Sequence, residues 1–128
     1  MKHKIAIIED DTTIAGMYRF KLEQAGYDAR CAFNGKQGLK LVKSFRPILI
    51  LLDLMMPEMT GDEMLEKVRA TSWGANIKVI ALTNISKDEA PPGLRLLNVD
   101  RYIVKAHYTP AQVVALVAEI LADAQATK

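Results

Sequence analysis

The sequence has little cysteine, no long apolar run and almost no net charge, and each shortage excludes a class of protein. Cys31 is the single cysteine among 128 residues, so no internal disulfide can form. A formal net charge of +2 is too small to indicate a nucleic-acid or membrane partner by itself. No apolar run reaches the roughly 18 residues that span a bilayer, and residues 1–4 show no signal-peptide pattern. We therefore expect one cytoplasmic domain over residues 1–128.

Short β-branched or leucine-rich runs alternate with amphipathic stretches along the chain. We expect strands at residues 4–8, 27–32, 48–52, 77–82 and 102–104, and helices at residues 12–24, 36–45, 62–70 and 109–124. The run from Ile48 to Leu52 is continuously apolar, as is typical of a buried parallel strand. Five strands separated by helices predict an α/β fold, a doubly wound five-stranded parallel sheet with helices on both faces.

A further helix is expected between Ser86 and Asn98, where the sequence Pro91-Pro92-Gly93 interrupts the pattern. Proline removes a backbone donor and clashes with the preceding helical turn. This helix is therefore predicted to be short, starting near Pro92, or partly unwound.

Polar residues follow four of the five predicted strands. They are Glu9, Asp10 and Asp11 after the first strand, Asp53 after the third, Thr83 after the fourth and Lys105 after the fifth. In open α/β sheets, ligands bind beyond the carboxyl ends of the strands. Carboxylates that face one cleft repel each other, and a bound divalent cation removes that conflict. Oxygen ligands without a histidine or cysteine cluster favour Mg²⁺, while a hydroxyl and an ammonium group complete a site for a phosphoryl group.

Each of these residues also has an ordinary structural interpretation. The acidic residues 9–11 could simply cap the first helix, because Asp favours that position. Asp53 could be a turn residue, and a lone Thr or Lys is usually solvated. The joint placement of these groups at four strand ends favours the phosphoryl site.

Four segments resemble the receiver domains of two-component response regulators, and the resemblance covers nearly the whole chain. They are residues 5–11 (IAIIEDD), 51–61 (LLDLMMPEMTG), 79–83 (VIALT) and 102–105 (YIVK). The second segment is the most specific, with Asp53, Pro57 and Gly61 at the spacing of that family. The resemblance implies a flavodoxin-like sheet with the strand order 2-1-3-4-5.

The resemblance also implies roles for the acidic residues. Asp53 would be the nucleophile that accepts a phosphoryl group and would also bind Mg²⁺. Asp10 would bind the ion directly, Glu9 would act through a water, and the backbone carbonyl of Met55 would be a further ligand. Asp11 is interpreted as the start of the first helix.

The remaining implied roles concern the phosphoryl group and its signal. Thr83 and Lys105 would grip the phosphoryl oxygens, and Tyr102 would be an aromatic switch residue. The donor would be a histidine kinase or a phosphotransfer protein. The output partner stays unknown, with neither direct nucleic-acid binding nor a membrane expected. Such a switch catalyses only its own phosphorylation and dephosphorylation.

The chain departs from the family pattern after the site lysine, where a proline in a cis peptide is usual and Ala106 stands instead. A non-proline cis bond costs roughly 3–4 kcal/mol, so a trans bond is predicted and the loop could be reshaped. Asn84 also stands where a smaller residue is common. Ala106 and the proline-interrupted helix slightly favour an alternative, a phosphorylation-independent interaction module of the same fold, whereas the complete set of acceptor residues argues against it. A metal-dependent phosphatase or flavodoxin-like enzyme ranks last, because no second substrate pocket or separate acid–base group is evident.

Three surface features complete the predictions. The last predicted helix carries a stripe of alanines that should face away from the core: Ala111, Ala115, Ala118 and Ala122. The stripe could support a homodimer, or alanine could be there only as a good helix former. The resemblance implies that the side chains two positions after the acceptor and two after the threonine border the approach of a hydrolytic water. Here they are the apolar Met55 and Ile85, so the phospho-form should be long-lived; alternatively, both residues only pack against their neighbours. Lysines 36, 40 and 43 form a basic stripe that favours a solvated face over a nucleic-acid patch, since no aromatic residue is interleaved.

Overall fold

A five-stranded parallel sheet forms the centre of the protein, seen in a computed structural model that describes residues 2–84 and 92–126. Its strands are β1 (Lys4–Ile8), β2 (Asp28–Ala32), β3 (Leu49–Asp53), β4 (Lys78–Thr83) and β5 (Arg101–Val104). They pair in the order β2-β1-β3-β4-β5, which confirms the order implied by the resemblance. Each observed strand boundary lies within one residue of the predicted one.

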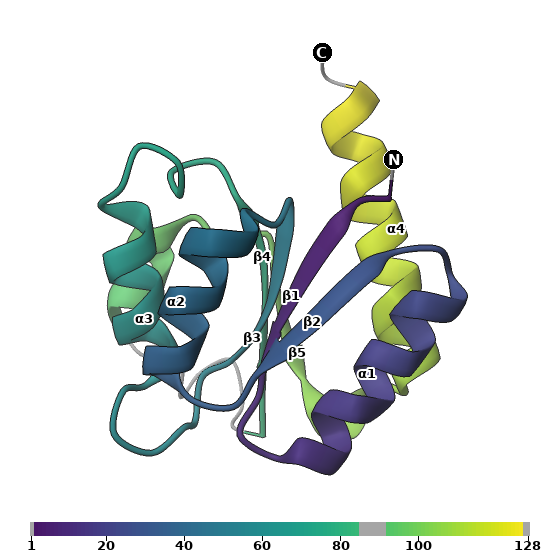
Figure 1. Ribbon diagram of the computed structural model, residues 1–128, viewed down its shortest axis with the longest axis horizontal. Helices are drawn as coiled ribbons and strands as arrows, with labels where there is room; N and C mark the ends of the chain where they lie inside the picture. The colour runs from purple at the N-terminus through teal and green to yellow at the C-terminus, as the bar shows by residue number, and fades with distance from the viewer. Residues whose placement is uncertain (1, 85–91, 127–128) are drawn as a thin grey trace.

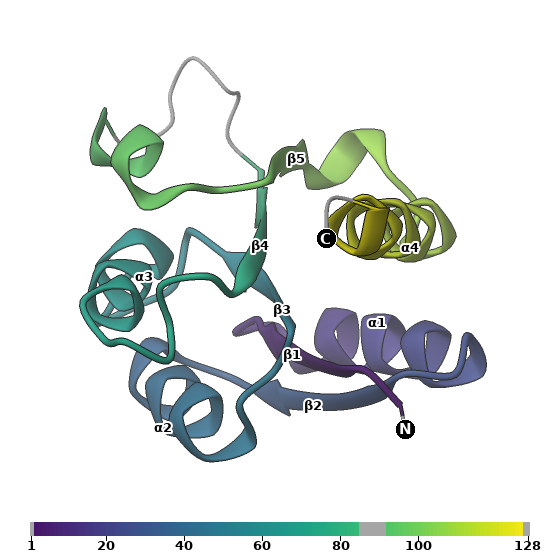
Figure 2. The ribbon, with the colours of Figure 1, turned by 90° about the horizontal axis from the view of Figure 1, so that it is seen from above.

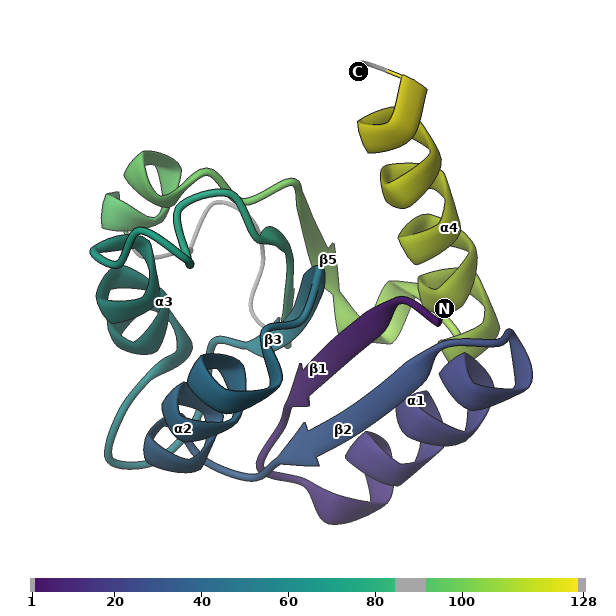
Figure 3. The ribbon, with the colours of Figure 1, turned by 45° about the horizontal axis from the view of Figure 1, so that its top comes forward.

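Helices cover both faces of this sheet, as Figures 1 and 3 show. Helices α1 (Thr12–Gln24) and α4 (Pro110–Ala126) pack on one face. Helices α2 (Gly35–Phe45) and α3 (Gly61–Arg69) pack on the other. Strand side chains alternate between the two resulting cores, because successive residues of a strand point to opposite faces. Burial on both sides explains why the central strand β3 is apolar at four consecutive positions.

Asp11 caps the start of helix α1, which agrees with its predicted place there. The Asp11 carboxylate accepts hydrogen bonds from the backbone N–H groups of Thr13 and Ile14, at 3.0 and 3.1 Å. These bonds satisfy donors that have no partner inside the helix. Asp11 therefore has a structural role, which separates it from Glu9 and Asp10 immediately before it.

The proline-interrupted segment forms a short 3₁₀ helix, η2 (Pro92–Leu97), which confirms the predicted start near Pro92. The earlier part of that prediction, residues 86–91, lies outside the described residues. Helix η2 packs beside α3, as Figure 2 shows. The guanidinium group of Arg69 at the end of α3 donates hydrogen bonds to five backbone carbonyl oxygens, those of Gly74, Ala75, Ile77, Leu97 and Asn98. These bonds tie two connections to α3, the one between α3 and β4 and the one between η2 and β5.

The outer surface of α4 matches its sequence pattern. Val113, Val117, Ile120 and Leu121 are buried, whereas the four predicted surface alanines, 111, 115, 118 and 122, are all exposed. The alanine stripe thus lies outside, as expected, and the homodimer through it stays a prediction. In the described part of the chain, no helix has both the length and the hydropathy needed to cross a bilayer.

Candidate functional site

Asp53 lies at the carboxyl end of β3, where the central strand leaves the sheet. The residue is only 3% exposed. The backbone N–H of Met55 donates to Asp53 Oδ1 at 3.0 Å, which fixes one carboxylate oxygen. The returning chain passes so close that a Cβ atom on Gly61 would lie 2.3 Å from the backbone oxygen of Asp53. Glycine at position 61 is therefore required to close the loop that follows Asp53.

Three carboxylates meet at this edge of the sheet, because β1 and β3 are adjacent and parallel. One oxygen from each of Glu9, Asp10 and Asp53 lies within 4.8 Å of the others. We call these three residues the carboxylate cluster. Glu9 is 1% exposed, and its Oε2 accepts a hydrogen bond from the backbone N–H of Asp11 at 3.2 Å. Asp10 is exposed, so the cluster has two buried members and one that faces solvent.

Lys105 brings the positive charge of the site from the end of β5. Its ammonium nitrogen forms an ion pair with Glu9 Oε1 and lies 3.4 Å from Asp53 Oδ2. The side chain is largely buried and reaches Asp53 past strand β4, and Glu9 past strands β4 and β3. The peptide bond between Lys105 and Ala106 is trans, as predicted, and this geometry still lets the lysine reach Asp53.

The pKa values of these groups follow from burial and from crowding of like charge. Burial, followed by the hydrogen bond with Glu9, raises the pKa of Asp53 to about 8. Burial also acts to raise the pKa of Asp10, but hydrogen bonds with Asp53 and Glu9 outweigh it and the pKa is lowered. For Lys105, burial acts to lower the pKa, and the bond to Glu9 and the charge of Asp53 raise it overall. One ammonium group therefore does not neutralise three carboxylates, and without a bound cation the site favours the protonated form of Asp53.

This donor set fits a magnesium ion. The three side chains offer oxygen atoms, which are the ligands that a hard cation prefers. A divalent cation would also resolve the repulsion that raises the pKa of Asp53. Glu9 is already bonded to Lys105 and to the backbone of Asp11, whereas Asp10 is exposed and more available to an ion.

The other predicted residues lie at or near the same edge. Thr83 ends β4, next to β3, and is fully buried. Met55 follows the acceptor, and its side chain is 57% exposed at the rim of the cluster. Tyr102 lies in β5, half-buried against the core beneath α2 and α3. Ile85, which was predicted to border the site with Met55, lies outside the described residues.

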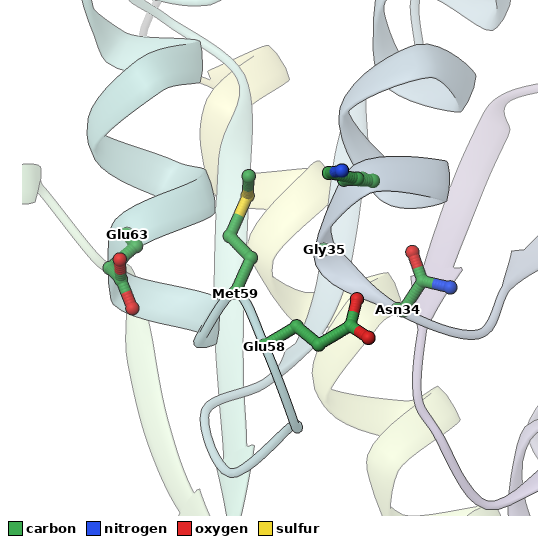
Figure 4. A pocket seen from close by; sticks show the side chains of 6 residues that line it. Asn34, Gly35, Glu58, Met59 and Glu63 are labelled. Atoms are coloured by element: carbon green, nitrogen blue, oxygen red, sulfur yellow. The ribbon is translucent and has the colours of Figure 1, made fainter.

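A hollow of about 430 Å³ lies beside the site without including the carboxylate cluster. It is lined by Asn34, Gly35, Lys36, Glu58, Met59 and Glu63. Figure 4 shows the side chain of Glu58 extending from the loop after β3 toward Asn34 at the start of α2. Its lining mixes charges of both signs, so it has no evident selectivity for one ligand.

Sequence reasoning missed one feature of the site, the ion pair between Lys105 and Glu9. The sequence pattern places both residues at strand ends but does not show which carboxylate a flexible lysine selects. The pair makes Glu9 a partner of the lysine as well as a member of the carboxylate cluster.

Comparisons with known proteins agree with this geometry. A family model described as the response regulator receiver domain matches residues 5–118. The alkaline phosphatase synthesis transcriptional regulatory protein PhoP of Bacillus subtilis is 31% identical over 94% of this chain and 49% of its own length. The DNA-binding dual master transcriptional regulator RpaA of Synechocystis is 37% identical over 66% of this chain and 35% of its own length. The chain thus spans half or less of these relatives.

Solved structures give the same result for the fold. A CheY-like response regulator receiver domain protein from Methanospirillum hungatei superposes with a TM-score of 0.88 at 27% identity, over the whole of both chains. Chemotaxis response regulator CheY4 of Vibrio cholerae superposes with a TM-score of 0.85 at 24% identity, over 94% of this chain and 99% of that one.

Proposed function

The chain belongs to the response regulator receiver-domain family of two-component signalling, and we propose that Asp53 is its phospho-acceptor. One observation carries the proposal: the buried Asp53 carboxylate lies with Glu9 and Asp10 on one side and with the Lys105 ammonium group 3.4 Å away. An isolated buried carboxylate is unfavourable, so this grouping favours a site that holds additional charge during function.

The proposed reaction transfers a phosphoryl group from a phosphohistidine of a histidine kinase or a phosphotransfer protein. An ionised oxygen of Asp53 attacks phosphorus, the phosphorus–nitrogen bond breaks, and an acyl phosphate forms on Asp53. The leaving imidazole nitrogen keeps the bonding electron pair. Lys105 neutralises one phosphoryl oxygen, and the Thr83 hydroxyl donates a hydrogen bond to another. The protein thus contributes mainly by positioning the reactants and neutralising charge.

The carboxylate cluster would hold Mg²⁺ for this step. Asp10 and Asp53 would contact the ion directly, Glu9 would act through a water, and the backbone carbonyl of Met55 would add a ligand. When bound, the ion supplies positive charge that neutralises the phosphoryl oxygens. The ion pair that already holds Glu9 supports its indirect role.

Phosphorylation would switch a partner-binding face through Thr83 and Tyr102. Thr83 ends β4 in the buried edge of the sheet, and Tyr102 lies on the neighbouring strand, opposite Ala81 in register. A change at the threonine could therefore reach the half-buried tyrosine through one pair of strands. The relatives named above are transcription regulators about twice as long as this chain, so their output partners are not carried over to it.

A phosphorylation-independent interaction module is the alternative. The alanine at position 106 favoured this alternative, because it implies a trans peptide bond after Lys105. With that bond trans, the Lys105 side chain still lies 3.4 Å from Asp53, which supports the phospho-switch instead.

Labelling with a small phosphodonor tests the proposal. The protein is incubated with acetyl phosphate and Mg²⁺, and the acyl phosphate is then reduced with borohydride and located by peptide mass spectrometry. We expect one modified residue, Asp53, and no label when EDTA removes the divalent ion. Label at another position, or undiminished labelling in EDTA, would overturn the assignment.

A further inference from the structure

Six basic side chains gather on the surface formed by α2 and the strands β1 and β2. We call them the basic patch: Lys4, Arg30, Lys36, Lys40, Lys43 and Arg46, all of them exposed. No aspartate or glutamate occurs from residue 29 to residue 52. Asp28 borders the patch opposite Lys4 in the β1–β2 register. Within the part of the chain that the structure describes, no carboxylate lies within 4 Å of any of the six cationic groups.

Aromatic rings support three of these cations. The Phe45 ring lies beneath two of them, with its centre 5.4 Å from Lys4 Nζ and 4.4 Å from the guanidinium carbon of Arg30. The guanidinium of Arg46 lies 4.6 Å from the ring centre of Trp73. These three cations lie outside the predicted stripe of Lys36, Lys40 and Lys43. The rings come from distant positions, and cation–π attraction restricts where the charges can move.

The three lysines of α2 extend the patch along the helix. They are spaced by four and then three residues, so they share one face. At 1.5 Å per residue, the first and last of them start about 10 Å apart along the axis. Arg46 follows directly after α2 in a left-handed conformation, and its Nε donates to the carbonyl oxygen of Lys43 at 2.7 Å. Three of the six cations are thus held against aromatic rings, and Arg46 is also tied to the end of α2.

We propose that the basic patch is a docking surface for a short acidic segment of another protein. The guanidinium groups of Arg30 and Arg46 present planar donors that match carboxylates. Because the rings already restrict Arg30 and Arg46, binding loses less side-chain entropy than it would at unsupported arginines.

The charge of the rest of the chain favours a short partner over an extended polyanion. Outside the patch, 11 basic residues face 15 acidic ones. A long nucleic acid or a flat anionic membrane would reach beyond the patch and meet this net negative remainder, whereas a short segment would meet only the cations. Phe45 is 3% exposed beneath its cations, so its ring is not available to stack on a base.

Fluorescence anisotropy with a labelled decamer of glutamate tests this proposal. We expect saturable binding at low ionic strength that weakens as salt is added. Reversing two charges with Lys40→Glu and Lys43→Glu should weaken binding at least tenfold. The matched control, Lys21→Glu with Lys67→Glu, makes the same charge change on α1 and α3 and should alter affinity less than twofold. Circular dichroism of both variants checks that the fold is kept.

Two further variants separate the possible causes. Arg30→Lys with Arg46→Lys keeps the charge but removes the planar donors, and we expect it to weaken binding about threefold. Asp53→Asn should bind the decamer as the parent does, so this test is independent of the phospho-acceptor proposal. No saturable binding, equal losses in the two charge-reversal variants, or tighter binding to a ten-base-pair duplex or to phosphatidylserine vesicles would overturn the proposal.

Discussion

The carboxylate cluster and the basic patch both crowd like charges, but one is buried and the other is exposed to water. Two like charges 4 Å apart repel by about 1 kcal/mol in water and by about 4 kcal/mol at the effective dielectric near a protein surface. In the cluster, burial is the main cause that raises the pKa of Asp53 to about 8, and the hydrogen bond and negative charge of Glu9 add to it. The six cations of the patch lie in solvent, on aromatic rings or beside the helix, where such crowding costs little.

This difference indicates different kinds of ligand. The buried cluster has a fixed geometry and carries negative charge that Lys105 does not fully neutralise. It therefore suits a small hard cation and a phosphoryl group. The exposed patch suits a flexible acidic segment whose binding depends on salt. The predictions below alter one region at a time and use the other as a reference.

The largest effect is expected on magnesium affinity. Asp10→Ala should weaken Mg²⁺ binding by about a hundredfold, because it removes a direct ligand, and Glu9→Ala by about tenfold, as is typical of an indirect partner. Isothermal titration measures both. Asp11→Ala is the matched control: it should cost about 1 kcal/mol of stability through the lost helix cap and leave affinity unchanged. Equal losses in Asp10→Ala and Glu9→Ala would contradict the assigned roles.

The next effect concerns how stability depends on pH without divalent ions. Asp53 has a pKa of about 8 in the folded chain, against about 4 for an ordinary carboxyl group. Between these values the folded chain binds more protons than the unfolded chain, so the free energy of unfolding should fall as pH rises. This group alone contributes a slope of up to about 1.4 kcal/mol per pH unit. Urea denaturation in EDTA between pH 4 and pH 8 measures it.

Two variants show whether the slope belongs to the cluster. Asp53→Asn removes the titrating group and should flatten the curve over this range. Lys40→Glu with Lys43→Glu changes exposed charges only, so it should keep the slope and shift stability by about 0.5 kcal/mol or less. Saturating Mg²⁺ should restore stability at pH 8 by binding the folded state. A slope that survives in Asp53→Asn would assign the effect to other groups.

The smallest effect is expected at the rim of the cluster. The exposed thioether of Met55 cannot orient a water for hydrolysis of the acyl phosphate, so the phospho-form should last longer than seconds. Met55→Asn supplies a polar group and should speed the decay of purified phospho-protein by about three- to tenfold, which is up to about 1.4 kcal/mol of barrier. Met55→Leu is the apolar control and should decay as the parent does. A slower Met55→Asn variant would contradict this role.

Much of the fold could be predicted because it depends on local patterns. Apolar runs located every strand to within one residue, and Pro92 marked the start of η2. The members of the carboxylate cluster could be predicted as well, since parallel strands bring their carboxyl ends to one edge.

Contacts between side chains distant in sequence could not be predicted in the same way. Periodicity does not show that Lys105 pairs with Glu9, that Arg30 stacks on Phe45, or that Arg69 binds the carbonyl groups before β5. These contacts depend on rotamers and on the packing of neighbouring elements. The Lys105 contact supports the interpretation of Glu9, and the Arg30 contact supports the proposal for the basic patch.

The central claim is that the carboxylate cluster makes Asp53 the phospho-acceptor, and comparing two matched variants tests it most directly. Asp53→Asn and Asp62→Asn each replace one aspartate by its isosteric amide, the first in the cluster and the second at the start of α3. Both are incubated with acetyl phosphate and Mg²⁺ and examined by intact-protein mass spectrometry. The account predicts that Asp62→Asn gains one acid- and base-labile phosphoryl group, as the parent does, and that Asp53→Asn stays folded and gains none. A labelled Asp53→Asn protein would contradict it.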